Sequence, residues 1–165
     1  MGKPELKIPL TTTDKIIEII SVVFVFGIWA LTLWNYADLP ETIPTHYGIG
    51  GKADAFGNKQ SIFMLPIVAT IMYVLLSVLS KYPHTFNYIV EITPENAEYQ
   101  YKISTRMMRI LKISIVCVFM FIVYNDIQNG KGNMDGLSVW FFPMTMLLIF
   151  APIFYALIKS SRDKG

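Results

Sequence analysis

Four strongly apolar stretches constrain what this chain can fold into. They cover residues 16–36, 61–80, 107–124 and 137–158. Each is close to the roughly 20 residues that a helix needs to cross a hydrocarbon core of about 30 Å, and the apolar residues form blocks instead of following the half-buried period of a soluble helix. Because 53% of the residues are hydrophobic, we predict an all-α membrane protein with four transmembrane helices, a single integral membrane domain over residues 1–165.

The first apolar stretch is predicted to be a retained membrane anchor. It follows Lys3, Lys7 and Lys15, as a signal peptide would, but it runs for 21 residues without a small-x-small cleavage signature before Asp38. Cys117 is the single cysteine, so one chain can build neither a disulfide nor a cysteine metal cluster. We expect no cofactor.

The distribution of lysine and arginine predicts the orientation of the helices. With a cytoplasmic N-terminus, eleven of these residues fall inside and three outside, as the positive-inside rule requires. The inner group is Lys3, Lys7, Lys15, Lys81, Lys102, Arg106, Arg109, Lys112, Lys159, Arg162 and Lys164, and the outer group is Lys52, Lys59 and Lys131. Short connections favour an antiparallel up-down-up-down bundle, so we expect both termini in the cytoplasm.

The third helix is predicted to be longer than its membrane span. Thr93 suits an N-cap, Pro94 the first helical position and Glu95 the positive helix start, and nothing breaks the pattern before Asn125. Such a helix of about 32 residues would measure about 48 Å. It would therefore extend by about a dozen residues into the cytoplasm.

Three basic residues share one face of that extension. Lys102, Arg106 and Arg109 recur at i, i+4 and i+7, which places them side by side on a helix. Such a stripe can anchor the helix to anionic lipid headgroups, or it can serve as a docking face for a cytoplasmic partner. The sequence leaves both interpretations open.

Glu18 is an ionisable residue inside a predicted span, where such groups are costly and usually paired or functional. Glu18 and Arg109 lie at matching depth on the cytoplasmic side, and Lys112 lies a few residues deeper. We predict an intramembrane ion pair of Glu18 with Arg109 and Lys112. Snorkelling of these side chains to the interface and a proton or ion relay are the alternatives.

The longest predicted connection is the outer segment from Leu39 to Lys59, between the first two spans. Its 21 residues exceed the usual loop of a compact bundle, which indicates either function or disorder. Apolar residues are scattered through it, namely Leu39, Ile43, Tyr47, Ile49 and Phe56. Because disordered segments lack such anchors, we expect an ordered outer loop packed on the end of the bundle.

His46 and Asp54 are the residues of this segment with the most chemical potential. As metal ligands they would need oxygens from other acids, and one histidine without cysteine is a weak zinc signal; the acids available are Asp38, Glu41, Asp126 and Asp135. As a hydrolytic site they lack a nucleophile elbow and a recognisable oxyanion arrangement. As a structural lock they would hydrogen-bond turn amides.

The spacing of the polar, proline and glycine residues in this segment resembles a family signature. Leu39-Pro40, Ile43-Pro44, His46, Gly51, Asp54, Gly57 and Lys59 are similar to the L-P-x-x-I-P-x-H-x4-G-x2-D-x2-G-x-K pattern of an uncharacterised bacterial membrane domain. That domain also opens the Sdp-type toxin-immunity proteins, and the resemblance covers roughly residues 16–80. It implies a multi-pass protein of the bacterial cytoplasmic membrane. Sdp-type proteins protect the producing cell from a secreted peptide toxin and are thought to hold a transcriptional repressor at the membrane, but they have further helices after the shared domain.

Three functions are compatible with this sequence. The first is a non-enzymatic membrane protein whose outer loop recognises or excludes a membrane-active peptide from outside the cell, in immunity or sensing. The second is a metal-dependent site or enzyme built on His46 and Asp54 at the outer face. The third is an accessory subunit of a transporter. The expected partners are the lipid bilayer and a secreted peptide, with no nucleic acid, and the oligomeric state is left open.

Overall fold

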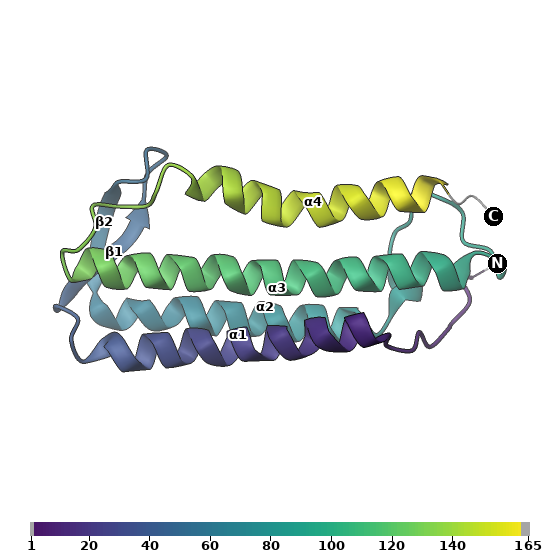
Figure 1. The fold of residues 1–165 in the computed structure, drawn as a ribbon, viewed down its shortest axis with the longest axis horizontal. Coiled ribbons are helices and arrows are strands. Elements are labelled where there is room, and N and C mark those ends of the chain that lie inside the picture. The colour runs from purple at the N-terminus through teal and green to yellow at the C-terminus, as the bar shows by residue number, and fades with distance from the viewer. Residues whose placement is uncertain (1, 163–165) are drawn as a thin grey trace.

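Four long helices lie side by side along the length of the molecule and a two-stranded sheet closes one end (Figure 1). The computed structural model describes residues 2–162; Lys164, counted above for the charge distribution, lies outside them. The helices are α1 (Thr12–Tyr36), α2 (Met64–Leu79), α3 (Ala97–Gly130) and α4 (Phe141–Arg162), and the short 3-10 helices η1 (Lys59–Phe63) and η2 (Pro83–Thr85) precede and follow α2. Among the described residues, α1, α3, α4 and the continuous η1–α2 segment are each long and apolar enough to cross a membrane, as the sequence predicts.

α3 is the central element of the bundle and packs against each of the other three helices. Its 34 residues correspond to about 51 Å. By contrast, α4 packs mainly on α3, and only 6% of its most apolar stretch of 18 residues is buried inside the protein. Much of the apolar surface of α4 is therefore exposed on the outside of the bundle.

Both ends of α3 differ from the prediction. The helix begins at Ala97 and not at Pro94, because Thr93 and Asn96 form a turn first: the Thr93 amide donates to Asn96 Oδ1 at 3.0 Å, and the Asn96 amide donates to Thr93 Oγ1 at 3.4 Å. At the other end the helix continues past Asn125 to Gly130. The side-chain amide of Asn125 donates to the Phe121 carbonyl at 2.7 Å, so this polar residue is accommodated within the helix.

The all-α prediction is wrong for the segment between α1 and α2, and the fold is mostly helical. This segment forms a β-hairpin of β1 (Thr42–Tyr47) and β2 (Ala53–Asn58), paired antiparallel from Thr42 opposite Asn58 to Tyr47 opposite Ala53. Pro40 and Pro44 favour an irregular loop because proline donates no hydrogen bond to a sheet. A two-stranded hairpin tolerates Pro44 because the register shifts directly after it, between Pro44 and His46.

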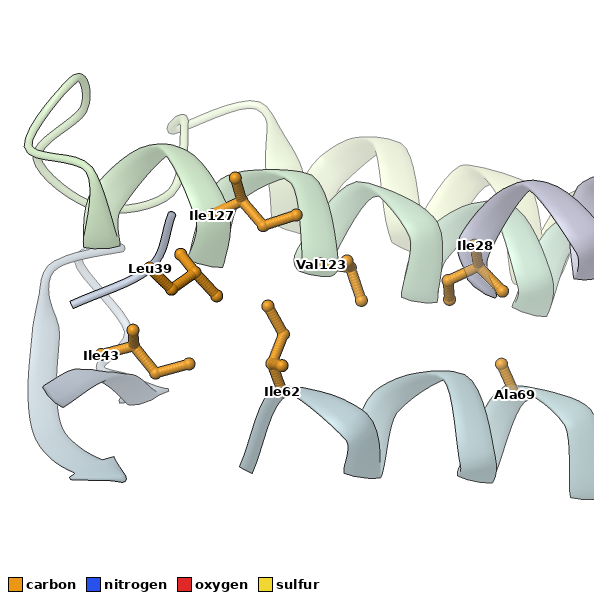
Figure 2. Packing of buried hydrophobic residues seen from close by; sticks show 7 residues of the cluster. All are labelled: Ile28, Leu39, Ile43, Ile62, Ala69, Val123 and Ile127. Atoms are coloured by element: carbon orange, nitrogen blue, oxygen red, sulfur yellow. The ribbon is translucent and has the colours of Figure 1, made fainter. Parts of the chain in front are cut away.

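The hydrophobic core is concentrated where the helices meet the hairpin. Figure 2 shows side chains from α1, η1, α2, α3 and the hairpin segment pointing toward one another; they are Ile28, Leu39, Ile43, Ile62, Ala69, Val123 and Ile127. All seven are at most 4% exposed. The hairpin is thus part of the core and is not a loose loop.

Candidate functional site

The hairpin and the residues that hold it, hereafter the hairpin cap (residues 39–59), form the candidate site. Leu39 and Ile43 insert their side chains between the hairpin and the end of α3, beside Ile127 (Figure 2). Gly130 lies directly beneath them: a Cβ there would come within 3.1 Å of Ile43 Cγ2 and 3.3 Å of Leu39 Cδ2. A Cβ at this position would therefore require the side chains of Ile43 and Leu39 to shift by a few tenths of an ångström.

A polar contact ties β1 to α3. The Tyr47 hydroxyl donates to Asp126 Oδ1 at 2.7 Å, and the Asn129 side-chain amide donates to the Tyr47 oxygen at 3.2 Å. Burial of the phenol, together with the nearby Asp126 carboxylate, raises the pKa of Tyr47 well above its usual value. From the sequence, Tyr47 is expected only as an apolar anchor and Asp126 only as a candidate metal ligand, and their hydrogen bond is not predicted. The polar residues Asn125, Asp126 and Asn129 directly after an apolar span are the signal that indicates polar contacts at the helix end.

The turn of the hairpin rests on the loop between α3 and α4. Gly51 has a φ of +79°, and its carbonyl accepts a hydrogen bond of 2.7 Å from the Leu137 amide. A Cβ on Gly51 would lie 2.5 Å from the Leu137 carbonyl oxygen, closer than two such atoms can approach. Glycine is therefore required here for both conformation and space.

His46 and Asp54 form a cross-strand pair on the outer surface of the cap. His46 Nδ1 lies 2.5 Å from Asp54 Oδ1, and both side chains are more than half exposed. Among residues 2–162 no group of three His, Cys, Asp or Glu side chains converges that could hold a metal ion. What the geometry supports is a contact that joins β1 to β2.

Three of the other four acids considered as metal ligands have separate contacts. Asp126 accepts from Tyr47 as described, Asp38 lies 3.6 Å from the Lys131 ammonium, and Glu41 lies 3.0 Å from the Lys59 ammonium. None of these contacts involves His46. The oxygen ligands expected for a metal site are thus divided among the segment after α1, the hairpin cap and the end of α3.

The remaining signature residues lie at the base of the hairpin. The Lys59 ammonium lies over the Tyr36 ring at 5.3 Å besides contacting Glu41, and the Lys59 amide donates to the Glu41 carbonyl at 3.0 Å. Gly57 leaves room for Thr45, whose Cγ2 would be 2.9 Å from a Cβ on Gly57. Pro40 packs over Gly130, where a Cβ would lie 3.7 Å from Pro40 Cδ. Each of these residues therefore contributes to the packing of the cap.

The surface of the cap also carries exposed apolar side chains. Ile49, in the turn, is 96% exposed, and Phe56, on β2, is 62% exposed. In the neighbouring loop Val139 and Trp140 are exposed as well. An ordered element that displays large apolar groups is suited to contact with an apolar or amphipathic ligand.

At the opposite end of the bundle, the structure brings Glu18, Arg109 and Lys112 together. Lys112 Nζ lies 2.6 Å from Glu18 Oε2, and Arg109 Nε lies 3.3 Å from Glu18 Oε1. The Lys112 ammonium also donates to Ser77 Oγ at 2.9 Å and lies over the Tyr73 ring at 4.7 Å. Lys112 is thereby buried with its charge fully surrounded by polar and aromatic partners.

Asp14 adds a second carboxylate that the sequence analysis did not single out. Its Oδ1 accepts from Arg106 Nε at 2.9 Å and lies 3.8 Å from Arg109 Nη1. The signal for Asp14 was a capping box: Thr11 Oγ1 accepts from the Asp14 amide and the Asp14 carboxylate accepts from the Thr11 amide. The helix cap therefore doubles as an ion-pair partner for α3.

The basic stripe on α3 does not form one continuous surface. The Arg109 side chain is 7% exposed and lies inside the bundle, whereas Lys102 is exposed and pairs with Glu98 on the same helix at 2.5 Å. Arg106 bridges to Asp14. A docking face at these three residues stays a prediction, and in this structure its accessible part is Lys102 with part of Arg106.

Four apolar helices with a hairpin cap are consistent with a multi-pass membrane protein. Residues 23–70 match a protein family described as a domain of unknown function (DUF1648), a region that covers the second half of α1, the hairpin and the first turns of α2. An uncharacterized protein of Archaeoglobus fulgidus is 26% identical over 163 residues, with 88% of this chain and 86% of that protein covered. No solved structure matches the chain. This relative is archaeal, and the bacterial origin that the resemblance implies stays a prediction.

Proposed function

We propose that this protein is a non-enzymatic multi-pass protein of the cell membrane that recognises a membrane-active peptide through its hairpin cap. The four helices would cross the bilayer in alternating directions, with both termini in the cytoplasm and the cap outside. Two features support this orientation: the start of α1 and the end of α4 lie at the end of the bundle away from the hairpin (Figure 1), and most basic residues are on that side by the charge distribution.

The observation that carries the proposal is the pair of exposed apolar residues on a firmly held cap, Ile49 and Phe56. The cap is anchored by the buried Ile43 and by the Tyr47–Asp126 hydrogen bond, so it displays these side chains in a defined place. Amphipathic peptides bind at a membrane surface through their apolar face. Apolar side chains held in place beside the bilayer would contact that face before the peptide inserts. Immunity to such a peptide, as the resemblance to Sdp-type proteins implies, is the corresponding cellular role.

The test is protection of cells that are sensitive to membrane-active peptides. Cells expressing the protein should survive a panel of such peptides better than cells with an empty vector, and the double variant Ile49→Ser with Phe56→Ser should lose this protection. Ile89→Ser is the matched control, because Ile89 is an apolar residue with a similar exposure of 59% at the other end of the molecule. Equal survival with the double variant and the unaltered protein, at equal membrane levels, would sink the proposal.

A metal-dependent site at His46 and Asp54 and a role as transporter accessory subunit stay predictions. Elemental analysis of the purified protein tests the first of them directly. A metal held in stoichiometric amount by the protein and lost in His46→Ala would replace the peptide proposal with a metal-dependent function.

A further inference from the structure

A cavity of about 720 Å³ opens at the end of the bundle opposite the hairpin cap. It lies between α1, α2, α3 and the N-terminal segment that precedes α1. Three basic side chains, Lys7, Lys81 and Arg109, line this cavity together with the single carboxylate Glu18. We call it the basic cavity.

The carboxylates near the basic cavity are already neutralised. Glu18 contacts both Lys112 and Arg109, and Asp14 receives the Arg106 guanidinium at 2.9 Å. In the part of the chain that the structure describes, the ammonium groups of Lys7 and Lys81 form neither an ion pair nor a hydrogen bond. The cavity therefore has an excess of positive charge on its wall.

Arg109 has unused hydrogen-bonding capacity at this site. Its side chain is more than nine-tenths buried, its Nε is shielded from solvent without a hydrogen-bond partner, and its contacts with Glu18 and Asp14 are at 3.3 and 3.8 Å. A guanidinium carries five N–H donors, and a buried donor without a hydrogen-bond acceptor is costly in free energy. The shielded Nε faces Glu18 and is not open to the cavity. Because Arg109 lines the cavity, an oxyanion there would accept from the terminal N–H groups of the guanidinium, for which no hydrogen bond is seen within residues 2–162.

The rest of the wall is apolar and faces the side of the bundle. Val74 and Val78 of α2 line the cavity and are both exposed at the helix surface, where acyl chains would lie against a membrane-spanning helix. Tyr82, also on the wall and half exposed, is of the residue type enriched at the headgroup level. The cavity thus joins a cationic region at the end of the bundle to an apolar region along its side.

From these observations we propose that the basic cavity binds the phosphate headgroup of an anionic lipid. The phosphate oxygens would accept hydrogen bonds from Arg109 and face the ammonium groups of Lys7 and Lys81, and the acyl chains would lie along Val74 and Val78. Arginine and lysine are the residues that bind phosphate, and basic pockets between transmembrane helices on the cytoplasmic side bind lipid headgroups. This inference requires that the helices span a membrane, but it is independent of peptide binding at the hairpin cap.

The test uses the full-length protein in nanodiscs of phosphatidylglycerol mixed with phosphatidylcholine, followed by native mass spectrometry of the lipids that remain bound. We expect preferential retention of phosphatidylglycerol. Lys7→Gln with Lys81→Gln should lower that retention by about fivefold for each lysine, the effect of one basic residue near an anionic headgroup. Both lysines are exposed and outside the ion pairs, so the double variant should keep the melting temperature of the unaltered protein.

Lys102→Gln with Lys159→Gln is the matched control. It removes the same charge at the same end of the bundle from residues that do not line the basic cavity, and it should leave retention unchanged. Equal loss in both double variants, or equal retention of the two lipids by the unaltered protein, would overturn the proposal. Inorganic phosphate that binds in pure phosphatidylcholine nanodiscs, with the same dependence on Lys7 and Lys81 but without a preference for phosphatidylglycerol, would replace the lipid with a soluble phosphate. Protection from peptides should be unaffected by Lys7 and Lys81, which separates this test from that of the proposed function.

Discussion

Single residues of the hairpin cap have different reasons for their identity. His46 and Asp54 are exposed and contact each other across the two strands, so they contribute to the surface of the cap. Gly51 and Gly57 are present because neighbouring atoms leave no space for a side chain. The signature over residues 39–59 therefore combines exposed residues that can take part in binding with glycines that permit the backbone to fold.

Gly51→Ala should destabilise the cap, and Gly50→Ala should not. At Gly51 the new Cβ would meet the Leu137 carbonyl oxygen at 2.5 Å with φ at +79°, and the left-handed conformation together with overpacking costs about 2 to 4 kcal/mol. At Gly50 nothing lies within 4 Å. Limited proteolysis within the cap measures the difference. Equal cleavage rates for the two variants would mean that the contact between Gly51 and Leu137 does not hold the turn.

At the scale of elements, the hairpin is held by the end of α3. α3 continues about a turn beyond its predicted end, and this places Asp126, Asn129 and Gly130 under the hairpin. The extra turn is stabilised by side-chain amides that donate to carbonyls of the preceding turn. Propensity and hydropathy predict the helix end poorly here, because polar residues that normally end a span have partners in the hairpin.

Tyr47→Phe should lower the stability of the protein by about 1 to 3 kcal/mol, since it leaves the buried Asp126 carboxylate without its donor. Tyr124→Phe is a suitable comparison, because Tyr124 is an exposed tyrosine of the same helix region and such surface changes stay within about 0.5 kcal/mol. Thermal unfolding in detergent gives both values. Identical melting temperatures for the two variants would contradict a stabilising role of the Tyr47–Asp126 hydrogen bond.

For the whole molecule, the two ends of the bundle have different chemistry. One end combines the main hydrophobic core with the hairpin cap, and the other contains the ion pairs of Asp14 and Glu18 with α3. This division fits a protein that presents its cap on the outer side of a membrane and its basic residues to the cytoplasm. It also separates the two proposed binding surfaces by the length of the bundle.

Site-specific labelling should establish this orientation. In a Cys117→Ser background, Lys52→Cys in the hairpin turn should react with a membrane-impermeant maleimide in intact cells. Lys159→Cys near the end of α4 should react only after the membrane is opened. The reverse pattern would show that the cap faces the cytoplasm and would exclude recognition of an extracellular peptide by the cap.

The sequence by itself determined the four apolar helices, because the length and hydropathy of a span are sums over neighbouring residues. It also indicated that the segment from Leu39 to Lys59 is ordered, since apolar anchors are visible locally. Only the tertiary structure decided that this segment is a β-hairpin, that Tyr47 meets Asp126, and that a cavity opens beside Arg109. These features depend on contacts between residues far apart in the chain; Tyr47 and Asp126, for example, are separated by 79 positions. A local sequence pattern does not show which distant group will form a hydrogen bond with a buried polar atom.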